Sequence, residues 1–519
     1  MSSYVYVANP NGTTYVYENT SYWDKDAKKT RHKRVSVGHL DPITKKLIPN
    51  RKKGDASRSK SAASDNTERC SVLGIGIKIL LDKAVSDIGL IKLLASVFPE
   101  DWNRILTCAY YLVSEGDALA HVEKWQGGNK APYEGLLTSQ RVSELLRRIT
   151  PSLQQDFFAK WISLNQQKEF YAMDITSVSS YSDFINFVRW GYNRDGEDLP
   201  QINLLMVTGV ESHLPLYYRI LPGSLKDVNS VLESLKSLKS FKLLDTKLFR
   251  FVMDKGFYSE PNVDAFYDSH KKFLMGVPFT TSLACEAVEE YRDEIKSHNN
   301  YCCVYGDELY AVTKPMKWDG HRFYRHVYYD SYKAAVDEKK FDHELYCCEM
   351  ELLSGKRVKA HESYYKNYFM INETPIRGIK VEFDEEAIAK HKKNRIGWFV
   401  LVSNDIKDKV RALEVYRSKD AVEKCFDDMK NDLDMKRLRM HTEATVEGRI
   451  FIQFIALLIT TRLKQVMNDA GWFKDYNLQE VLNEMKTIRE VSISGRRKKY
   501  KTELTSFQKK ISELYGLAL

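Results

Sequence analysis

Two aspartates of this 519-residue chain stand on apolar runs, where a charge needs a partner, and one glutamate stands in a helical segment with a polar stripe. Asp174 lies inside the run "EFYAMDITSV", Asp254 ends the run "KLFRFVMD", and Glu423 lies in "ALEVYRSKDAVEKCFDDMKNDL". A buried carboxylate is unfavourable unless it is paired, although Asp followed closely by Gly is also common in turns. If the three carboxylates meet, they form an all-oxygen set that suits Mg²⁺ or Mn²⁺ rather than Zn²⁺.

Polar residues recur at helical spacing around the glutamate. At about 100° per residue, Tyr416, Lys419, Glu423, Asp427 and Lys430 form one stripe at the edge of an apolar face. An exposed helix surface with ion pairs four residues apart would give the same pattern. Together with two strand-end aspartates, however, the stripe predicts a cleft for phosphodiester chemistry. Two metal ions about 4 Å apart can bind the attacking and leaving oxygens, and the lysines and the tyrosine can hold phosphate or sugar oxygens.

The spacing of apolar residues predicts the strands and helices that would position these groups. Between residues 168 and 279, apolar runs and capping residues predict strand-strand-strand-helix-strand-helix-strand, with Asp174 in the first strand and Asp254 at the end of the fourth. The two helices are expected to begin at Asp227 and Ser259. The strand "GWFVLVSND" and one long helix that carries Glu423 then resume the pattern in residues 396–470.

Residues 280–395 interrupt this pattern. Fifteen aromatic residues fall between Tyr301 and Met370, well above the average of the chain. We expect an inserted domain of mixed strands and helices here, with one helix at about residues 331–353. Residues 471–519 are expected to form a C-terminal helical region.

The N-terminal part has three compositions in succession. Residues 1–49 alternate in period two, with an Asn-Pro-Asn-Gly hairpin signal, and predict a β-rich region. Residues 50–69 are basic and rich in serine, as in a flexible linker. Residues 70–167 have apolar spacings of three and four, which predict a helical domain.

The net charge of +9 is concentrated near the N-terminus. Between Lys25 and Lys60 there are thirteen Lys and Arg against three acids, so this segment carries about the whole excess. Such an arm on a near-neutral body favours a polyanion partner, and Arg51, Lys52 and Lys53 are candidate DNA contacts. The alternative is a solvated, disordered leader.

The remaining sequence features favour a cytoplasmic location. The start lacks the basic and apolar regions of a signal peptide, and the apolar run Ile450–Ile459 is too short to span a membrane and contains Gln453. Eight cysteines without a CxxC pattern fit reduced thiols. A zinc site that combines the adjacent cysteine pairs with His298 or His343 would match no usual ligand spacing.

The order and spacing of these groups resemble the DDE transposases of bacterial insertion sequences, in the group with a Y-(2)-R-(3)-E-(6)-K signature and an inserted domain. Tyr416, Lys419, Glu423 and Lys430 keep these spacings, with Lys419 where the family has Arg. The lysine keeps the positive charge, but it lacks the paired N–H donors with which arginine binds a phosphate or carboxylate in a bidentate way. "MDITSV", "GYNRDGEDLPQINLLMV" and "LPGSLKDVNSV" resemble the first-Asp block and the segments after it, and "MDKGF" resembles the Asp-Arg-Gly-Tyr/Phe block, with Lys255 for Arg.

The resemblance implies an α/β multidomain protein with an RNase H-like core, a mixed five-stranded sheet with flanking helices. Residues 70–167 would bind DNA. Asp174, Asp254 and Glu423 would be the catalytic residues and would hold two Mg²⁺ ions, for which Mn²⁺ can substitute. The enzyme would bind transposon ends, cleave them and join the 3′-hydroxyls to target DNA, as a homodimer on DNA in the bacterial cytoplasm, associated with the nucleoid.

Further DNA contacts are expected from Tyr416, Lys419, Lys430 and Lys255. Trp318, in "MKWDGHRF", is a candidate for stacking on an unpaired base, with a packing role in the insertion as the alternative. A nuclease that does not join strands and an inactive DNA-binding descendant are the competing functions. Without metal, like charges should raise the pKa of at least one carboxyl, and Asp254 is expected to be that one because it looks the most enclosed.

Overall fold

The computed structural model describes residues 2–9, 13–24, 29–41, 44–50, 70–182, 185–225, 249–374, 378–440, 442–494 and 497–519. The chain forms two compact units, Met1–Arg69 and Cys70–Leu519. Three expectations lie outside the described residues: the contacts at Arg51, Lys52 and Lys53, the linker that follows Asn50, and the helix beginning at Asp227.

The first unit is a four-stranded antiparallel sheet in the order β1-β2-β3-β4, as its alternating sequence predicts. Its strands are β1 (Ser2–Ala8), β2 (Thr14–Asp24), β3 (Lys29–Leu40) and β4 (Leu47–Pro49). The expected hairpin is present, because Ala8 pairs with Thr14. The first eight residues of β3 are exposed and include four Lys or Arg, so this sheet presents a basic strand to solvent.

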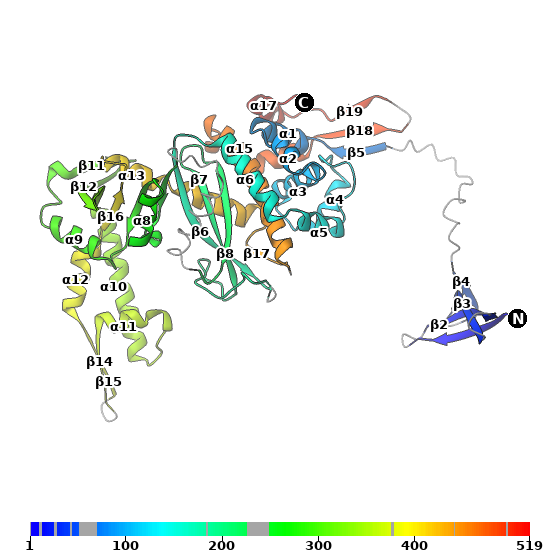
Figure 1. Cartoon of the computed structure of the whole chain (residues 1–519), viewed down its shortest axis with the longest axis horizontal. Coiled ribbons are helices and arrows are strands. Elements are labelled where there is room, and N and C mark those ends of the chain that lie inside the picture. The colour runs from blue at the N-terminus through cyan, green and yellow to red at the C-terminus, as the bar shows by residue number, and fades with distance from the viewer. Residues whose placement is uncertain are drawn as a thin grey trace. The chain divides into compact units, whose positions relative to one another are not determined.

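The second unit is built on a ten-stranded mixed sheet, in the order β11-β12-β13-β16-β10-β9-β6-β7-β8 with β17 beside β6 (Figure 1). The strands are β6 (Phe170–Ser180), β7 (Gln201–Gly209), β8 (Pro215–Pro222), β9 (Arg250–Met253), β10 (Lys272–Val277), β11 (Tyr301–Val304), β12 (Asp307–Trp318), β13 (His321–Tyr329), β16 (Trp398–Ser403) and β17 (Arg437–Leu438). The expectation of a sheet limited to five strands is wrong. All five are present, but β16 pairs antiparallel with β10 and extends the sheet, which removes an unpaired edge.

Residues 280–395 do not form one separate body. After helix α9 (Ser282–Tyr291), strands β11, β12 and β13 join the main sheet through β16. The rest has its own hydrophobic core, which includes Phe341, Leu345 and Tyr365. We call it the α10–α12 subdomain; it contains α10 (Ser331–Leu353), α11 (Glu362–Tyr368), β14 (Phe369–Thr374), β15 (Gly378–Phe383) and α12 (Glu385–Arg395).

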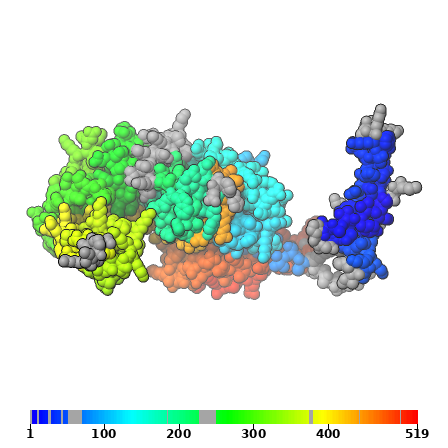
Figure 2. All heavy atoms as spheres, turned by 90° about the horizontal axis from the view of Figure 1, so that it is seen from below, coloured from blue at the N-terminus to red at the C-terminus, as the bar shows by residue number. Residues whose placement is uncertain are grey.

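Helices from both ends of the second unit pack together around α15 (Glu443–Asp469), and Figure 2 shows the cyan and orange segments in contact. The N-terminal group is α1 (Gly76–Asp87), α2 (Leu90–Val97), α3 (Trp102–Glu115), α4 (Val122–Gln126), α5 (Ser139–Arg148) and α6 (Pro151–Asn165). The C-terminal group is α16 (Leu478–Lys486) and α17 (Ser506–Tyr515). The expected helices are therefore present, with a small sheet in addition: β5 (Cys70–Gly74) pairs with β18 (Arg489–Ile493), which pairs with β19 (Lys499–Lys501).

Helix α15 is long and apolar enough to cross a membrane, but 78% of its apolar window is buried inside the protein, as in a core helix. Its buried Gln453 donates hydrogen bonds to the carbonyl oxygens of Leu433 (2.9 Å) and Asp434 (3.1 Å). Both donor hydrogens of this amide are thereby satisfied, which lowers the free-energy cost of burying it.

We predict that Gly448→Ala destabilises the protein, because Gly448 lies where α15 touches α5. A methyl group there would lie 2.2 Å from the carbonyl oxygen of Leu146, so the two helices must separate. Overpacking of this kind costs about 1–3 kcal/mol, to be measured by urea unfolding. Asn468→Ala, at an exposed position near the end of the same helix, should change stability little. Equal stability of the two variants would show that the contact tolerates a side chain.

Candidate active site

Asp174 and Asp254 lie on neighbouring parallel strands, as expected from the sequence. Strand β6 pairs with β9, and Met173 lies opposite Met253. Asp174 is the next residue of β6, and Asp254 directly follows β9, where a short 3₁₀ turn, Lys255–Phe257, begins. The strand pairing therefore brings two carboxylates to the same level of the sheet, where neighbouring strands are about 5 Å apart.

The segment around Glu423 is not one long helix, so that expectation is wrong. Helix α13 (Lys409–Arg417) ends at Ser418, α14 (Asp420–Asp427) follows, and a π-helical turn spans Asp428–Asp432. The Ser418 hydroxyl donates to the carbonyl oxygen of Glu414 (2.8 Å), a local bond that competes with helix propagation. Tyr416 and Glu423 therefore belong to different helices, and a single helical stripe does not describe them.

Side-chain contacts nevertheless connect the two helices with the strand ends. Tyr416 Oη donates to Asp254 Oδ1 at 2.7 Å, and Lys419 Nζ donates to Glu423 Oε1 at 2.8 Å. Lys419 Nζ also lies 5.7 Å from the centre of the Tyr416 ring. Helix α14 packs on β6 and β7, and Val422 is among its buried residues. The structure thus brings the three acids, the tyrosine and Lys419 to one region.

Burial and the neighbouring charges change the pKa of Asp174 in opposite directions. Burial raises the pKa of Asp174 to about 6, and the charge of Asp254 adds to the rise. The N–H of Ile175, which donates to Asp174 Oδ1 at 2.8 Å, and the charges of Arg194 and Lys419 oppose the rise. Burial of the carboxyl is therefore the largest cause of the raised pKa of Asp174.

Tyr416 and Lys419 are affected by the same acids. Burial is the largest cause that raises the pKa of Tyr416, followed by the charge of Asp254 and the hydrogen bond to it. Burial alone would lower the pKa of Lys419, but the hydrogen bond to Glu423 and the charges of the three acids raise it overall. The tyrosine therefore stays a neutral donor, and the lysine stays a cation.

The donor set fits a hard divalent cation. All candidate ligand atoms are carboxylate oxygens, and a cation between the strand ends would offset the unfavourable charge on Asp174. Glu423 is held differently from the aspartates: its side chain is 53% exposed and is paired with Lys419. The three acids are also not among the groups of described residues whose ligand atoms all lie within 4.8 Å of one another.

The other expected phosphate contacts divide into two cases. Lys255 is exposed beside Asp254 and is free to face a ligand from its position. Lys430 does not face the cleft as an open cation, because its side chain is 11% exposed and its Nζ contacts both carboxylate oxygens of Asp195, at 2.8 and 2.7 Å. Asp195 lies on the loop between β6 and β7, so Lys430 fastens that loop to the π-helical turn.

The structure places Trp318, the residue expected to stack on a base, at the end of the sheet away from the carboxylates. Strand β13 runs in the same direction as β10, so its first residue, His321, lies at the end of the sheet where Lys272 begins β10. Asp254 directly follows the opposite end of β9, level with Gly276 near the end of β10. The indole Nε1 of Trp318 instead donates to Asp264 Oδ1 at 2.7 Å. The sequence could not show this, because pairing with β16 decides which way the hairpin points.

Sequence reasoning missed two residues of the site. Arg194, on the β6–β7 loop, acts electrostatically on Asp174, and nothing in its polar surroundings distinguishes it. Gly276 lies in β10, where a methyl group would come within 2.8 Å of Tyr416 Oη and 3.1 Å of Lys255 Cβ. A glycine inside a strand often marks such a close approach, so the run "KKFLMGVP" did contain a usable signal.

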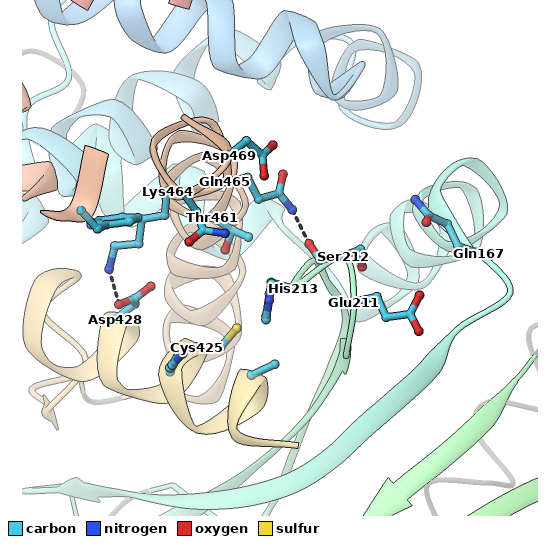
Figure 3. Close-up of a pocket in the computed structure, with 14 residues that line it drawn as sticks. Gln167, Glu211, Ser212, His213, Cys425, Asp428, Thr461, Lys464, Gln465 and Asp469 are labelled. Atoms are coloured by element: carbon cyan, nitrogen blue, oxygen red, sulfur yellow. Dashed lines mark hydrogen bonds and ion pairs between the residues drawn. The ribbon is translucent and has the colours of Figure 1, made fainter. Parts of the chain in front are cut away.

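A pocket lies behind α14, between this helix, α15 and the turn that joins β7 to β8 (Figure 3). Lys464 Nζ contacts Asp428 Oδ1 at 2.5 Å, and Gln465 Nε2 donates to the carbonyl oxygen of Ser212. Cys425 and Asp428 line the pocket from the face of α14 opposite to Glu423 at about 100° per residue. The pocket is therefore separate from the carboxylate region.

Comparison with known proteins places the chain in a family. The family model described as "Transposase DDE domain" matches residues 165–459, more than half of the chain, and the chain belongs to this family of enzymes that act on nucleic acid. No curated protein matches it. Among solved structures, a piggyBac transposase in a synaptic complex with hairpin DNA, determined by cryo-electron microscopy, is similar over 78% of this chain and 70% of that chain, at 11% identity and a TM-score of 0.37.

We predict that Asp174→Asn makes the metal-free protein more stable at pH 7. The pKa of Asp174 is raised in the fold from 3.8 to about 6, so its contribution to stability is present below about pH 4 and is lost as the pH rises through 6. The amide removes this loss, which corresponds to on the order of 3 kcal/mol. Thermal unfolding between pH 4 and 8 measures the effect.

A matched control is Asp293→Asn, since the side chain of Asp293 is 82% exposed. This variant should follow the wild type at every pH. If Asp174→Asn also follows the wild type, the carboxyl is better solvated than its burial suggests.

Proposed function

We propose that this chain is a DNA transposase that binds transposon ends, cleaves phosphodiesters and joins the freed 3′-hydroxyls to target DNA. The observation that carries the proposal is the parallel pairing of β6 and β9, which sets Asp174 and Asp254 side by side. The contacts of Tyr416 and Lys419 link this pair to Glu423. We further infer action as a homodimer on DNA, in the bacterial cytoplasm at the nucleoid.

The strand order supports an RNase H-like core. Strands β8-β7-β6 are antiparallel neighbours, and β6-β9-β10 are parallel neighbours. The first acid then lies on the central strand β6 and the second follows β9. The segment between β10 and β16 is an insertion in this scheme, and it contributes both the sheet extension and the α10–α12 subdomain. The spacing of Tyr416, Lys419, Glu423 and Lys430 supports the Y-R-E-K group of insertion-sequence enzymes.

Asp174, Asp254 and Glu423 would hold the metal, proposed as two Mg²⁺ ions with Mn²⁺ as a substitute. Bound metal would supply Lewis-acid stabilisation of the attacking and leaving oxygens. Tyr416 orients Asp254 by donating to one of its oxygens, which leaves the other oxygen available. Lys419 donates to one oxygen of Glu423, so the other oxygen would be available to a metal ion, and the lysine ammonium would lie near a bound phosphate.

Two surfaces support DNA binding. The exposed basic strand β3 offers Lys29, Arg31, Lys33 and Arg34 to phosphates. The β6–β7 loop, which carries Arg194 to the active site, exposes Trp190 (64%) and Tyr192 (85%). Aromatic faces stack on unpaired bases, so this loop takes the role that the sequence assigned to Trp318.

The loop has the support that a stacking platform requires. Its backbone is held by Gln201 Nε2 and Ser177 Oγ, which donate to the carbonyl oxygen of Tyr192 at 2.9 and 3.3 Å. Gly191 runs so close to Gly223 that a methyl group would lie 2.0 Å from its carbonyl oxygen. The two aromatic side chains are therefore presented from a fixed backbone.

Removal of single carboxylates tests the catalytic proposal. Asp174→Asn, Asp254→Asn and Glu423→Gln each remove a metal ligand at nearly constant volume, so each should reduce cleavage and joining at least 100-fold and leave DNA binding within about twofold. Cleavage and strand transfer are measured on end-labelled DNA with Mg²⁺ or Mn²⁺. Glu260→Gln, an exposed acid outside the site, is the control. A triad variant that cleaves at the wild-type rate would exclude that residue as a ligand, and cleavage without joining would indicate a nuclease.

The loop proposal is tested by comparing two tryptophans. Trp190→Ala and Tyr192→Ala should weaken processing of intact duplex ends about tenfold or more, since stacking contributes about 1–3 kcal/mol per base. Pre-nicked ends with an unpaired base should partly restore the activity. Trp318→Ala should lower the melting temperature. It should change little the ratio of the activity on intact ends to the activity on pre-nicked ends. If Trp318→Ala weakens processing of duplex ends and nicked ends restore it, while Trp190→Ala only lowers the melting temperature, the loop has no stacking role.

A further inference from the structure

Three side chains of the α10–α12 subdomain point their ligand atoms at one place. Cys348 Sγ, a Glu351 carboxylate oxygen and a His361 ring nitrogen all lie within 4.8 Å of one another. Cys348 and Glu351 are three residues apart on α10, which puts them on one helix face. His361 comes from a separate turn, Lys359–His361, that precedes α11. The main sheet contributes no residue to this cluster.

The burial of the cluster differs from that of a surface ion pair. Cys348 is 1% exposed, while Glu351 and His361 are partly buried, at 21% and 38% side-chain exposure. His361 Nδ1 lies 2.9 and 3.1 Å from the two oxygens of Glu351, and Tyr365 Oη donates to Glu351. Cys348 belongs to the hydrophobic core of the subdomain, and its thiol lies where this core meets the hydrogen-bonded Glu–His pair.

We infer that Cys348, Glu351 and His361 form a binding site for a transition-metal ion of the Zn²⁺ type. A thiolate, an imidazole and a carboxylate are the three ligand types that zinc takes from proteins, at 2.0–2.3 Å. Ligand atoms around a tetrahedral zinc lie roughly 3.5 Å apart, so a small inward movement of the three groups would complete the coordination. Water can fill the fourth position. Mg²⁺ would be disfavoured here because of the sulfur ligand.

This site differs from the zinc site that the cysteine pairs suggested. That alternative combined the adjacent cysteine pairs with His298 or His343. In the structure, His343 Nε2 lies 3.7 Å from Cys347 Sγ on the exposed side of α10. The cluster instead uses the second cysteine of the pair together with His361. Sequence spacing did not reveal it, because a 3₁₀ turn outside α10 supplies the histidine.

The metal would fix a basic turn. The eight residues Leu353–Ala360, directly before His361, are all exposed and include Lys356, Arg357 and Lys359. Cys348 and Glu351 hold one end of this turn, and His361 holds the other. Backbone bonds from Lys356 to the carbonyl oxygen of Glu351 (3.0 Å) and from Val358 to Tyr365 Oη (3.0 Å) already shape it. A structural ion at its base would hold the turn in one conformation.

The test uses the full chain, freed of metal with a chelator and then titrated with Zn²⁺ or Co²⁺ alone. We expect one equivalent to bind at this site, a thiolate-to-cobalt charge-transfer absorption band, and a higher melting temperature with Zn²⁺. Cys348→Ser should abolish the band, and His361→Gln should weaken binding at least tenfold. Cys347→Ser, the neighbouring thiol on the same helix, is the matched control and should keep the band.

Two results would overturn the inference. One is a wild-type chain that binds Co²⁺ without a thiolate band, and the other is a band that is lost in Cys347→Ser and kept in Cys348→Ser. The side chain of His361 is 38% exposed, so its replacement should leave the fold intact. The melting temperature of His361→Gln in chelator checks this. The catalytic acids are unchanged in all variants, so failure of this site leaves the proposed function untouched.

Discussion

The parallel pairing of β6 with β9 is the constraint on which the rest of the site depends. Both strands are buried, and their register puts Asp174 and Asp254 at the same level. A carboxylate at this place is unfavourable, because burial first, and the charge of Asp254 in addition, raise the pKa of Asp174. Such an arrangement is tolerated when a function requires it, and the surrounding groups act to reduce its free-energy cost. Tyr416, Lys419 and Arg194 are the groups that do so in this chain.

The interruption between α13 and α14 determines how these groups reach the aspartates. If the segment were one straight helix, the directions of Tyr416 and Glu423 around the helix axis would be fixed by their spacing in the sequence. The break at Ser418 lets α13 pack near β9 and β10 while α14 packs on β6 and β7. Lys419 lies at the junction, where it contacts both Tyr416 and Glu423.

Two other contacts connect the site to the body of the second unit. Strand β16 covers the edge of β10 and leads into α13, so the sheet extension also places Tyr416. Helix α15 follows the π-helical turn and is buried among helices from both ends of the unit. Gln453 of α15 binds the carbonyl oxygens of the segment just after that turn. Helix α14, which carries Glu423, is therefore held between the sheet and the segment that leads into α15.

The sequence by itself determined the local features: the five strands from β6 to β10, the helix α10, the N-terminal hairpin, and the order of the three acids and their basic neighbours. These follow from periodicity and short-range chemistry, which act within a few residues. Only the tertiary structure decided that the sheet continues through β16 to β11, that Trp318 lies away from the carboxylates, that Lys430 is bound to Asp195, and that His361 meets Cys348. Each of these depends on contacts between separate elements, and the free energy of such contacts comes from burial and register that no local pattern encodes.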